Sequence, residues 1–302
     1  VINETLIETP HSFRTAATIT TQIVAQVASC QYGGQTFSTS HLAPYVRKSY
    51  DNYIKEVASE LYDYSFGDIN GEIFKENVEK IARKRLKKEI ADGIQTIQYQ
   101  LNTLMTTNGQ SPFLSIAMWI NEDPEYEKEN AMIIEEILKQ RITGVKDKEG
   151  HYISPAFPKL LYFLDDNNAY EGSKYFYLTE LAAKCSAKRL VPDYISVKAM
   201  KENIGEVFPC MGCRSFLSPW YDENGKNKAY GRFNMGVVSL NLVDAGLSAN
   251  GDLDLFWDIL DERLNLCYEA LMLRINKLKG TTTETAPILW EHGAFARLPK
   301  GS

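Results

Sequence analysis

The chain has 302 residues, which allows one large domain or two of ordinary size. Hydrophobic residues make up 44% and charged residues 24%, and this balance excludes disordered, collagen-like and coiled-coil proteins. The 33 Lys and Arg against 39 Asp and Glu give a net charge of -6, which argues against binding nucleic acid through bulk charge.

The sequence carries no sign of membrane insertion or secretion. No run of 18 apolar residues free of charge occurs, so we expect no membrane-spanning segment and no membrane partner. Residues 1–10 lack the features of a signal peptide and an initiator Met, and we interpret the chain as part of a longer protein. The five cysteines are scattered and odd in number, which favours a reducing cytoplasm over a disulfide framework.

Hydrophobic periodicity and turn residues predict the following elements in chain order: helices at 19–28, 43–63 and 70–107, a buried strand at 113–119, and a helix at 127–138. A polar loop at 143–155 is followed by a strand at 157–164, a helix at 175–189 and a strand at 194–197. We expect a fourth strand at 236–242, a helix at 254–278 and a fifth strand at 288–290. This alternation predicts an α/β fold with a largely parallel sheet or barrel.

Six basic residues lie between positions 80 and 89 of the third predicted helix. A solvated helix face is the first interpretation, and a surface for an anionic ligand or a partner subunit is the alternative.

The most unusual stretch, residues 208–220, contains Cys210 and Cys213 with Gly212 between them. A C-x-x-C pair is found in half of a zinc site, in a redox pair, or by coincidence in a core loop. The other cysteines, Cys30, Cys185 and Cys267, have no His at ligand spacing, so the four ligands of a structural zinc site are missing and redox or radical chemistry is favoured. Gly212 allows a sharp turn and a close approach of the backbone to another group.

Residues 210–217 (CMGCRSFL) and 234–242 (NMGVVSLNL) closely resemble the anaerobic, class III ribonucleoside-triphosphate reductases. Further segments resemble the same family in the same order: 25–29, 32–34, 42–46, 102–104, 108–113, 157–160, 188–189, 192–193 and 286–289. The resemblance therefore runs over nearly the whole chain.

This resemblance implies an α/β fold that forms part of a glycyl-radical-enzyme type α/β barrel, with a central cysteine-bearing loop and long flanking helices. It implies that residues 1–302 are an incomplete catalytic barrel domain, without the family's N-terminal ATP cone and C-terminal glycyl radical domain. The expected activity is thiyl-radical reduction of ribonucleoside triphosphates to deoxyribonucleoside triphosphates for anaerobic DNA synthesis, with this chain inactive alone. A different glycyl radical enzyme acting on a small metabolite, and an inactive nucleotide-binding regulatory module, are the alternatives.

The resemblance also implies roles for the two cysteines of residues 208–220, called the cysteine segment below, and for Asn234. Cys213 matches the cysteine that carries the thiyl radical, and Asn234 matches an asparagine near the substrate sugar, although a turn residue is its alternative interpretation. Cys210 either supplies electrons as a thiol or only packs.

Weaker roles follow for two other groups. Ser29, Gly33 and Gly34 lie where backbone N–H groups can cradle a triphosphate. The loop at 141–158 resembles the segment that links the effector site to the substrate site of the family. Its basic residues and the lysine that follows it are expected to contact either nucleotide phosphates or only solvent: Arg141, Lys146, Lys148 and Lys159. The helix that ends near residue 103 resembles the family's dimer-interface helix, where a deoxynucleotide effector binds.

The cofactors and partners implied by the family lie largely outside this chain. They are a glycyl radical generated by an AdoMet iron-sulfur activase (a radical-SAM enzyme), formate or a thiol as reductant, and zinc only in the C-terminal part. The expected partners are ribonucleoside triphosphate substrates, dNTP and ATP effectors and a second copy in a homodimer, without nucleic acid.

Overall fold

The computed structural model describes residues 8–31, 33–64, 71–107, 109, 111–155, 157–210, 212, 216, 220–227, 231–232, 236–293 and 297–302. The chain consists of two compact units. The first comprises Val1–Ser29 and Gly34–Tyr230, and the second comprises Cys30–Gly33 and Gly231–Ser302.

The first unit is built on a four-stranded sheet whose neighbouring strands are all parallel. Its strands are β1 (Gln35–Ser38), β2 (Leu114–Met118), β5 (Lys159–Leu164) and β6 (Asp193–Ser196), in the order β1-β2-β5-β6. The predictions of strands in β2, β5 and β6 are confirmed, as is the α/β class with a parallel sheet. The sequence did not predict β1, which follows Gly33 and Gly34.

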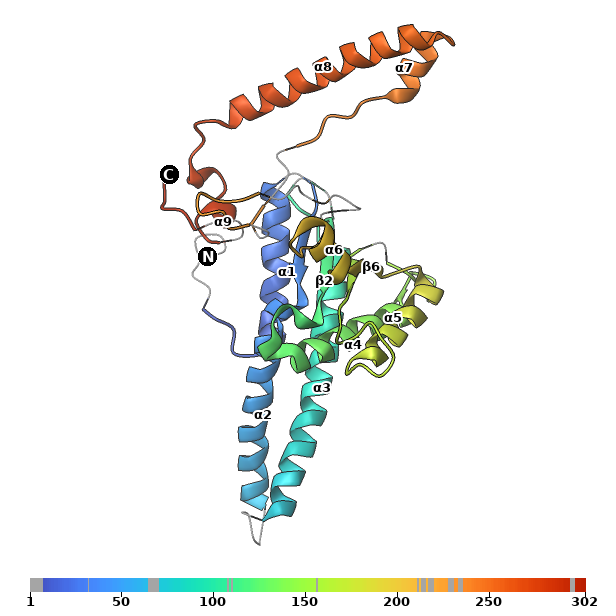
Figure 1. Cartoon of the computed structure of the whole chain (residues 1–302). Coiled ribbons are helices and arrows are strands. Elements are labelled where there is room, and N and C mark those ends of the chain that lie inside the picture. Colours follow the sequence, from blue (N-terminus) through green and yellow to red (C-terminus); the bar gives the residue numbers. More distant parts are fainter. Residues whose placement is uncertain are drawn as a thin grey trace. The chain divides into compact units, whose positions relative to one another are not determined.

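Long helices accompany this sheet (Figure 1). They are α1 (Phe13–Cys30), α2 (Ala43–Tyr64), α3 (Glu72–Thr103), α4 (Glu127–Thr143), α5 (Phe176–Arg189) and the shorter α6 (Val197–Ile204). Helices α2 and α3 form a long hairpin, and the basic residues of 80–89 belong to the α3 side of it. Short 3-10 turns lie at Thr39–His41, Ile120–Glu122, Pro124–Tyr126 and Thr283–Thr285. All five helices predicted before residue 190 are confirmed.

The two faces of the sheet bury different cores because side chains alternate along each strand. Ile116 and Leu160 face the larger core, which includes residues of α1, α3, α4 and α5. Ala117 and Leu161 face a smaller cluster that includes Phe208 and Cys210. The cysteine segment therefore begins on the face of the sheet opposite the larger helical core.

The predicted polar loop at 143–155 contains a small antiparallel hairpin, β3 (Val145–Lys146) and β4 (Tyr152–Ile153). Within its turn, Asp147 Oδ1 accepts hydrogen bonds from the backbone N–H groups of Glu149 and His151, at 2.9 and 2.8 Å. The side chains of these three residues bring possible metal ligands within 4.8 Å of one another. The hydrogen bonds of the turn explain this grouping without a cation.

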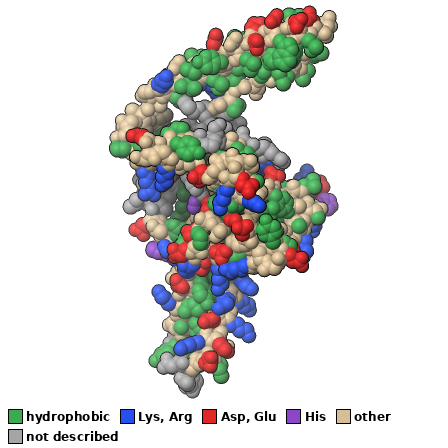
Figure 2. All heavy atoms as spheres, in the orientation of Figure 1, with side chains coloured by type: hydrophobic (Ala, Val, Ile, Leu, Met, Phe, Trp, Pro, Cys, Tyr) green, Lys and Arg blue, Asp and Glu red, His purple; other side chains and the backbone are tan. Residues whose placement is uncertain are grey.

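The second unit contains α7 (Leu242–Ala249), α8 (Leu253–Leu278) and the short α9 (Pro287–Trp290). The helix predicted at 254–278 is confirmed, and its exposed apolar side chains include Trp257. Figure 2 shows hydrophobic side chains along this helix.

The two strands predicted in the second unit are wrong. Residues 236–241 form no strand, and Asn241 instead caps α7 by accepting a hydrogen bond from Asp244 N. Residues 288–290 are helical because Pro287 opens α9 at a position where its missing N–H costs nothing.

None of the described helices combines the length and apolar character that crossing a bilayer requires.

Tyr162 gives the first unit a testable dependence on alkaline pH. Its side chain on β5 is fully buried, and its hydroxyl accepts a hydrogen bond from Asn168 Nδ2 and lies 2.9 Å from Thr179 Oγ1. Burial raises the pKa of this phenol to about 12, although the two hydrogen bonds oppose the shift. Between pH 10 and 12 the native state therefore keeps a proton that the unfolded chain loses, and the free energy of unfolding falls as pH rises.

In Tyr162→Phe we expect the free energy of unfolding to fall less steeply between pH 10 and 12. The slope should be smaller than that of wild type by about 1.4 kcal/mol per pH unit. Urea unfolding at a series of pH values from 9 to 12 measures it for both proteins. If the free energies of unfolding of the two proteins fall in parallel over this range, the Tyr162 hydroxyl does not contribute.

Candidate active site

The beginnings of three strands meet at one edge of the sheet. Gly34, Phe113 and Phe157 precede β1, β2 and β5, and parallel pairing places these positions side by side. Gln35 N donates a 2.9 Å hydrogen bond to Phe113 O, and the rings of Phe113 and Phe157 lie 4.6 Å apart between centroids. This edge is therefore closely packed even without the contacts of the cysteine segment.

The cysteine segment is held against the same edge. Thr36 Oγ1 on β1 donates a hydrogen bond of 3.2 Å to Cys210 O. A Cβ on Gly34 would lie 3.2 Å from Gly212 Cα and 2.7 Å from the ring of Phe113. Gly212 itself has a φ of +62°, so the sharp turn expected of this glycine is present. Two glycines thus allow the backbone before Cys213 to approach the sheet closely.

Cys210 is buried, with 5% of its surface exposed, and belongs to the cluster that includes Phe208 and Leu161. This environment suits a packed thiol, and the supply of electrons by Cys210 stays a prediction. Cys213 and Asn234 lie outside the described residues, and their roles also stay predictions.

Of the residues predicted to cradle a triphosphate, Ser29 lies in the last turn of α1, and Gly33 and Gly34 follow that helix. Ser29 Oγ donates to Ala25 O at 2.9 Å and accepts from Thr107 N at 3.3 Å, so it stabilises the chain locally. Gly33 has a φ of +91°, and Gly34 packs under Phe113. The C-terminal end of a helix carries partial negative charge, which disfavours an anion there. The triphosphate role of these three residues stays a prediction, and Gly34 has a clear steric role.

Among the basic residues predicted to meet phosphates, Arg141 is held inside the first unit. It is 3% exposed and donates hydrogen bonds to Pro155 O at 3.3 Å and Pro158 O at 2.6 Å. Burial lowers the pKa of its guanidinium to about 10, with Arg189 adding to the effect and Cys185 opposing it, so the group stays charged at neutral pH. A phosphate contact would have to replace these bonds, and the role of Arg141 in phosphate binding stays a prediction.

The lysines of this group lie differently. Lys146 and Lys148 are exposed on the hairpin, where Lys146 Nζ lies 5.3 Å from the centroid of the Tyr152 ring. Lys159 begins β5 and is partly buried. Their contacts with nucleotide phosphates stay predictions.

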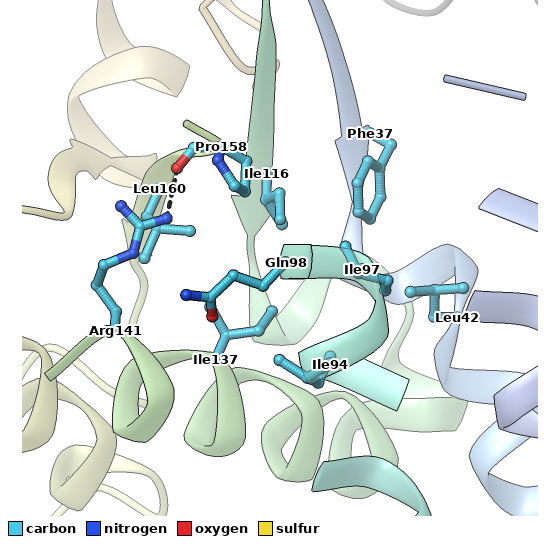
Figure 3. Close-up of a pocket in the computed structure, with 10 residues that line it drawn as sticks. All are labelled: Phe37, Leu42, Ile94, Ile97, Gln98, Ile116, Ile137, Arg141, Pro158 and Leu160. Carbon is cyan, nitrogen blue, oxygen red and sulfur yellow. Dashed lines mark hydrogen bonds between the residues drawn. The ribbon is translucent and has the colours of Figure 1, made fainter. Parts of the chain in front are cut away.

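A small cavity lies beside Arg141, between the sheet and helices α3 and α4 (Figure 3). Figure 3 shows the Arg141 guanidinium directed toward Pro158, with Gln98 and Ile137 below it. The cavity of about 20 Å³ has room for about one water molecule and none for a nucleotide. It is therefore a packing feature of the larger core, and the candidate site remains at the edge that holds Gly212.

Arg141 supplies a prediction about stability. Arg141→Met leaves the carbonyls of Pro155 and Pro158 buried without a donor, and we expect the free energy of unfolding to fall by about 2–4 kcal/mol. Arg141→Lys should lower the free energy of unfolding by a smaller amount, because an ammonium keeps the charge but cannot donate to both carbonyls with the geometry of a guanidinium. Urea unfolding without nucleotide measures both variants. Wild-type stability of Arg141→Met would show that these hydrogen bonds contribute nothing.

Two residues of this edge were not predicted from the sequence. Thr36 was missed because β1 is a short, partly polar segment, although the strand-forming Thr36 and Phe37 directly follow two glycines and Gln35. Phe113 was identified only as the start of a strand, and its contacts with Gly34 and Gly212 depend on tertiary structure.

Comparison with a solved structure identifies the fold. The chain is similar to the anaerobic ribonucleotide reductase from Thermotoga maritima, solved in complex with dATP and CTP, with a TM-score of 0.59 and 15% sequence identity. The similarity covers 97% of this chain and 45% of that one.

Comparison of sequences then identifies the family. The model of the family "Anaerobic ribonucleoside-triphosphate reductase" matches residues 1–301. The chain is 39% identical over 298 residues to the anaerobic ribonucleoside-triphosphate reductase of Enterobacteria phage T4, covering 96% of this chain and 46% of the relative. It is 38% identical over 292 residues to that of Escherichia coli K12, covering 95% and 38%. The chain belongs to the anaerobic ribonucleoside-triphosphate reductase family, and it spans less than half the length of these relatives.

Proposed function

We propose that this chain is the part of an anaerobic ribonucleotide reductase that binds a ribonucleoside triphosphate and carries the thiyl radical on Cys213. The observation that carries the proposal is the packing of the cysteine segment against the sheet edge, where a Cβ on Gly34 would lie only 3.2 Å from Gly212 Cα. The two glycines let the backbone at Gly212 approach a parallel sheet closely. Membership of the family supports the choice of chemistry.

Cys213 is the residue type that this chemistry needs. Its thiol gives a hydrogen atom to the stored radical and becomes a sulfur radical, which removes the 3′ hydrogen of the ribose reversibly. The 2′ hydroxyl takes up a proton and leaves as water. Formate, oxidised to CO2, or two thiols, oxidised to a disulfide, supply the two electrons, and the Cys213 thiol returns a hydrogen atom to the 3′ carbon. A closely packed setting supports this role because it keeps water and competing reactions away from the radical.

Asn234 and the reductant complete the proposed reaction. A side-chain amide can donate to a leaving hydroxyl and to a small carboxylate, which suits formate as the reductant. A thiol protein is the other reductant consistent with the family resemblance. Cys210 takes part as an electron donor only in that second case.

The remaining proposed components lie largely outside this chain. A glycyl radical supplied by a radical-SAM activase stores the unpaired electron, and zinc belongs to a C-terminal part. dNTP and ATP act as effectors, and a homodimer is the working assembly in the cytoplasm. The relative from Thermotoga maritima, solved with dATP and CTP, supports a nucleotide substrate and nucleotide effectors.

The test uses the intact reductase that carries this segment, with its activase, under anaerobic conditions. We expect CTP or another ribonucleoside triphosphate to yield the deoxynucleotide, and a substrate deuterated at the 3′ position to react more slowly. Omitting formate, or replacing it with a dithiol protein, separates the two reductants. Formation of the glycyl radical without any deoxynucleotide would contradict the proposal and favour another glycyl radical enzyme.

A further inference from the structure

A row of polar side chains crosses the sheet on the face that carries the cysteine segment. Thr36 on β1 pairs with Ser115 on β2, and Ser115 pairs with Lys159 on β5. Paired residues of parallel strands point to the same face, and this face is the one of Ala117 and Leu161, opposite the larger core. The three side chains therefore lie next to one another at the beginning of their strands.

Ser115 is the unusual member of this row. It is 0% exposed, and its Oγ makes no hydrogen bond with any residue that the structure describes. A buried hydroxyl without a partner costs stability, and alanine would remove that cost. Residues that break a local rule in this way are expected where a ligand completes the hydrogen bond.

The two neighbours of Ser115 in this row add a positive charge, from Lys159, and a contact with the cysteine segment, from Thr36. Lys159 is partly buried, and within the described part of the chain no hydrogen bond or ion pair joins its ammonium to another residue. Thr36 Oγ1 donates to Cys210 O, so the cysteine segment lies at one end of the row. Strands lie about 4.8 Å apart, so a single ligand group can contact both the Ser115 hydroxyl and the Lys159 ammonium.

We propose that Ser115 and Lys159 form a subsite for an oxyanion, a phosphate or carboxylate group, beside the cysteine segment. The hydroxyl donates one hydrogen bond and the ammonium supplies the charge, which together favour an anionic oxygen. The inference rests on the proposed function for the identity of the anion, because that reaction offers two sources: the triphosphate of the nucleotide and formate.

Binding is tested first, without turnover, on the intact reductase that carries this segment. The probes are inorganic tripolyphosphate and sodium formate, each titrated while the thermal unfolding midpoint is recorded. Without a probe, Ser115→Ala should unfold at the wild-type temperature or above it. With the probe that the subsite accepts, Ser115→Ala and Lys159→Gln should need about tenfold more of it for the same shift.

Matched variants separate the subsite from other effects of charge. Lys159→Arg keeps the positive charge and should retain most of the response. Lys184→Gln removes an exposed lysine from α5, on the side of the larger core, and should respond as wild type. Tripolyphosphate binding at other sites of the reductase should shift the unfolding midpoint equally in all variants. The subsite is therefore judged by the difference between the shift of each variant and that of wild type.

The two sources of the anion give different results. A weaker tripolyphosphate response, with a raised KM for CTP and an unchanged KM for formate, places a nucleotide phosphate at Ser115 and Lys159. A weaker formate response, with a raised KM for formate alone, places the carboxylate there. Unchanged responses to both probes, or a less stable ligand-free Ser115→Ala, would overturn the subsite. Since the binding measurements need no turnover, failure of the proposed reaction is seen separately, in the activity assay.

Discussion

Cys213→Ala in the intact reductase is expected to abolish deoxynucleotide formation while the glycyl radical still forms. Alanine has no sulfur–hydrogen bond, so nothing at this position can pass the unpaired electron to the 3′ carbon of the ribose. Direct abstraction from outside the cysteine segment would lack the positioning on which such reactions depend. Electron paramagnetic resonance measures the stored radical, and chromatography of the nucleotides measures the product in the same anaerobic sample.

Two other cysteines serve as controls for this experiment. Cys267→Ala changes a partly exposed residue of α8 and should leave turnover unchanged. Cys210→Ala changes the buried partner in the C-x-x-C pair, and its activity with formate and with a dithiol protein shows whether this thiol donates electrons. Turnover by Cys213→Ala would show that the radical relay is another residue.

The fold was predictable wherever burial imposed a simple pattern. Strands β2 and β5 are continuous apolar runs because both faces of the sheet are covered, and turn residues bound each run. The long helices show the periodicity of one buried face. Strand β1 was not predictable in this way, because Thr36 and Ser38 on one of its faces are polar.

The two wrongly predicted strands share a cause. Apolar residues of 236–242 and 288–290 suit a buried strand, but local helix signals decide the structure. Asn241 caps one helix and Pro287 opens the other. With few residues in either run, hydrophobicity alone cannot separate a strand from a short helix.

The candidate site was predictable in its residue types and less so in its contacts. The C-x-x-C pair with its glycine indicated redox or radical chemistry, and the family resemblance implied a role for Cys213. The Ser115 hydroxyl, which has no hydrogen-bond partner among the described residues, and the buried position of Arg141 do not follow from the sequence, because both depend on residues brought together by the sheet.

Gly34→Ala is expected to lower activity by about a hundredfold while reducing stability by only about 1–3 kcal/mol. The new Cβ would lie 2.7 Å from Phe113 Cδ1 and 3.2 Å from both Phe113 O and Gly212 Cα. The ring cannot move freely because it packs on Phe157, so the backbone at Gly212 has to give way. A displacement there moves Cys213, and reactions between positioned groups fall steeply with such shifts.

The effect is measured as kcat/KM of the intact reductase, with radical yield and urea unfolding recorded on the same preparations. Gly246→Ala is the matched control, because a Cβ there meets no atom within 4 Å outside its own helix backbone among the described residues, and alanine favours the helix α7. Adding Phe113→Leu to Gly34→Ala should recover part of the lost activity, since the smaller side chain frees space for the new Cβ. Additive losses in the double variant would show that the two positions act independently, and that the contact between Gly34 and Phe113 does not position the cysteine segment.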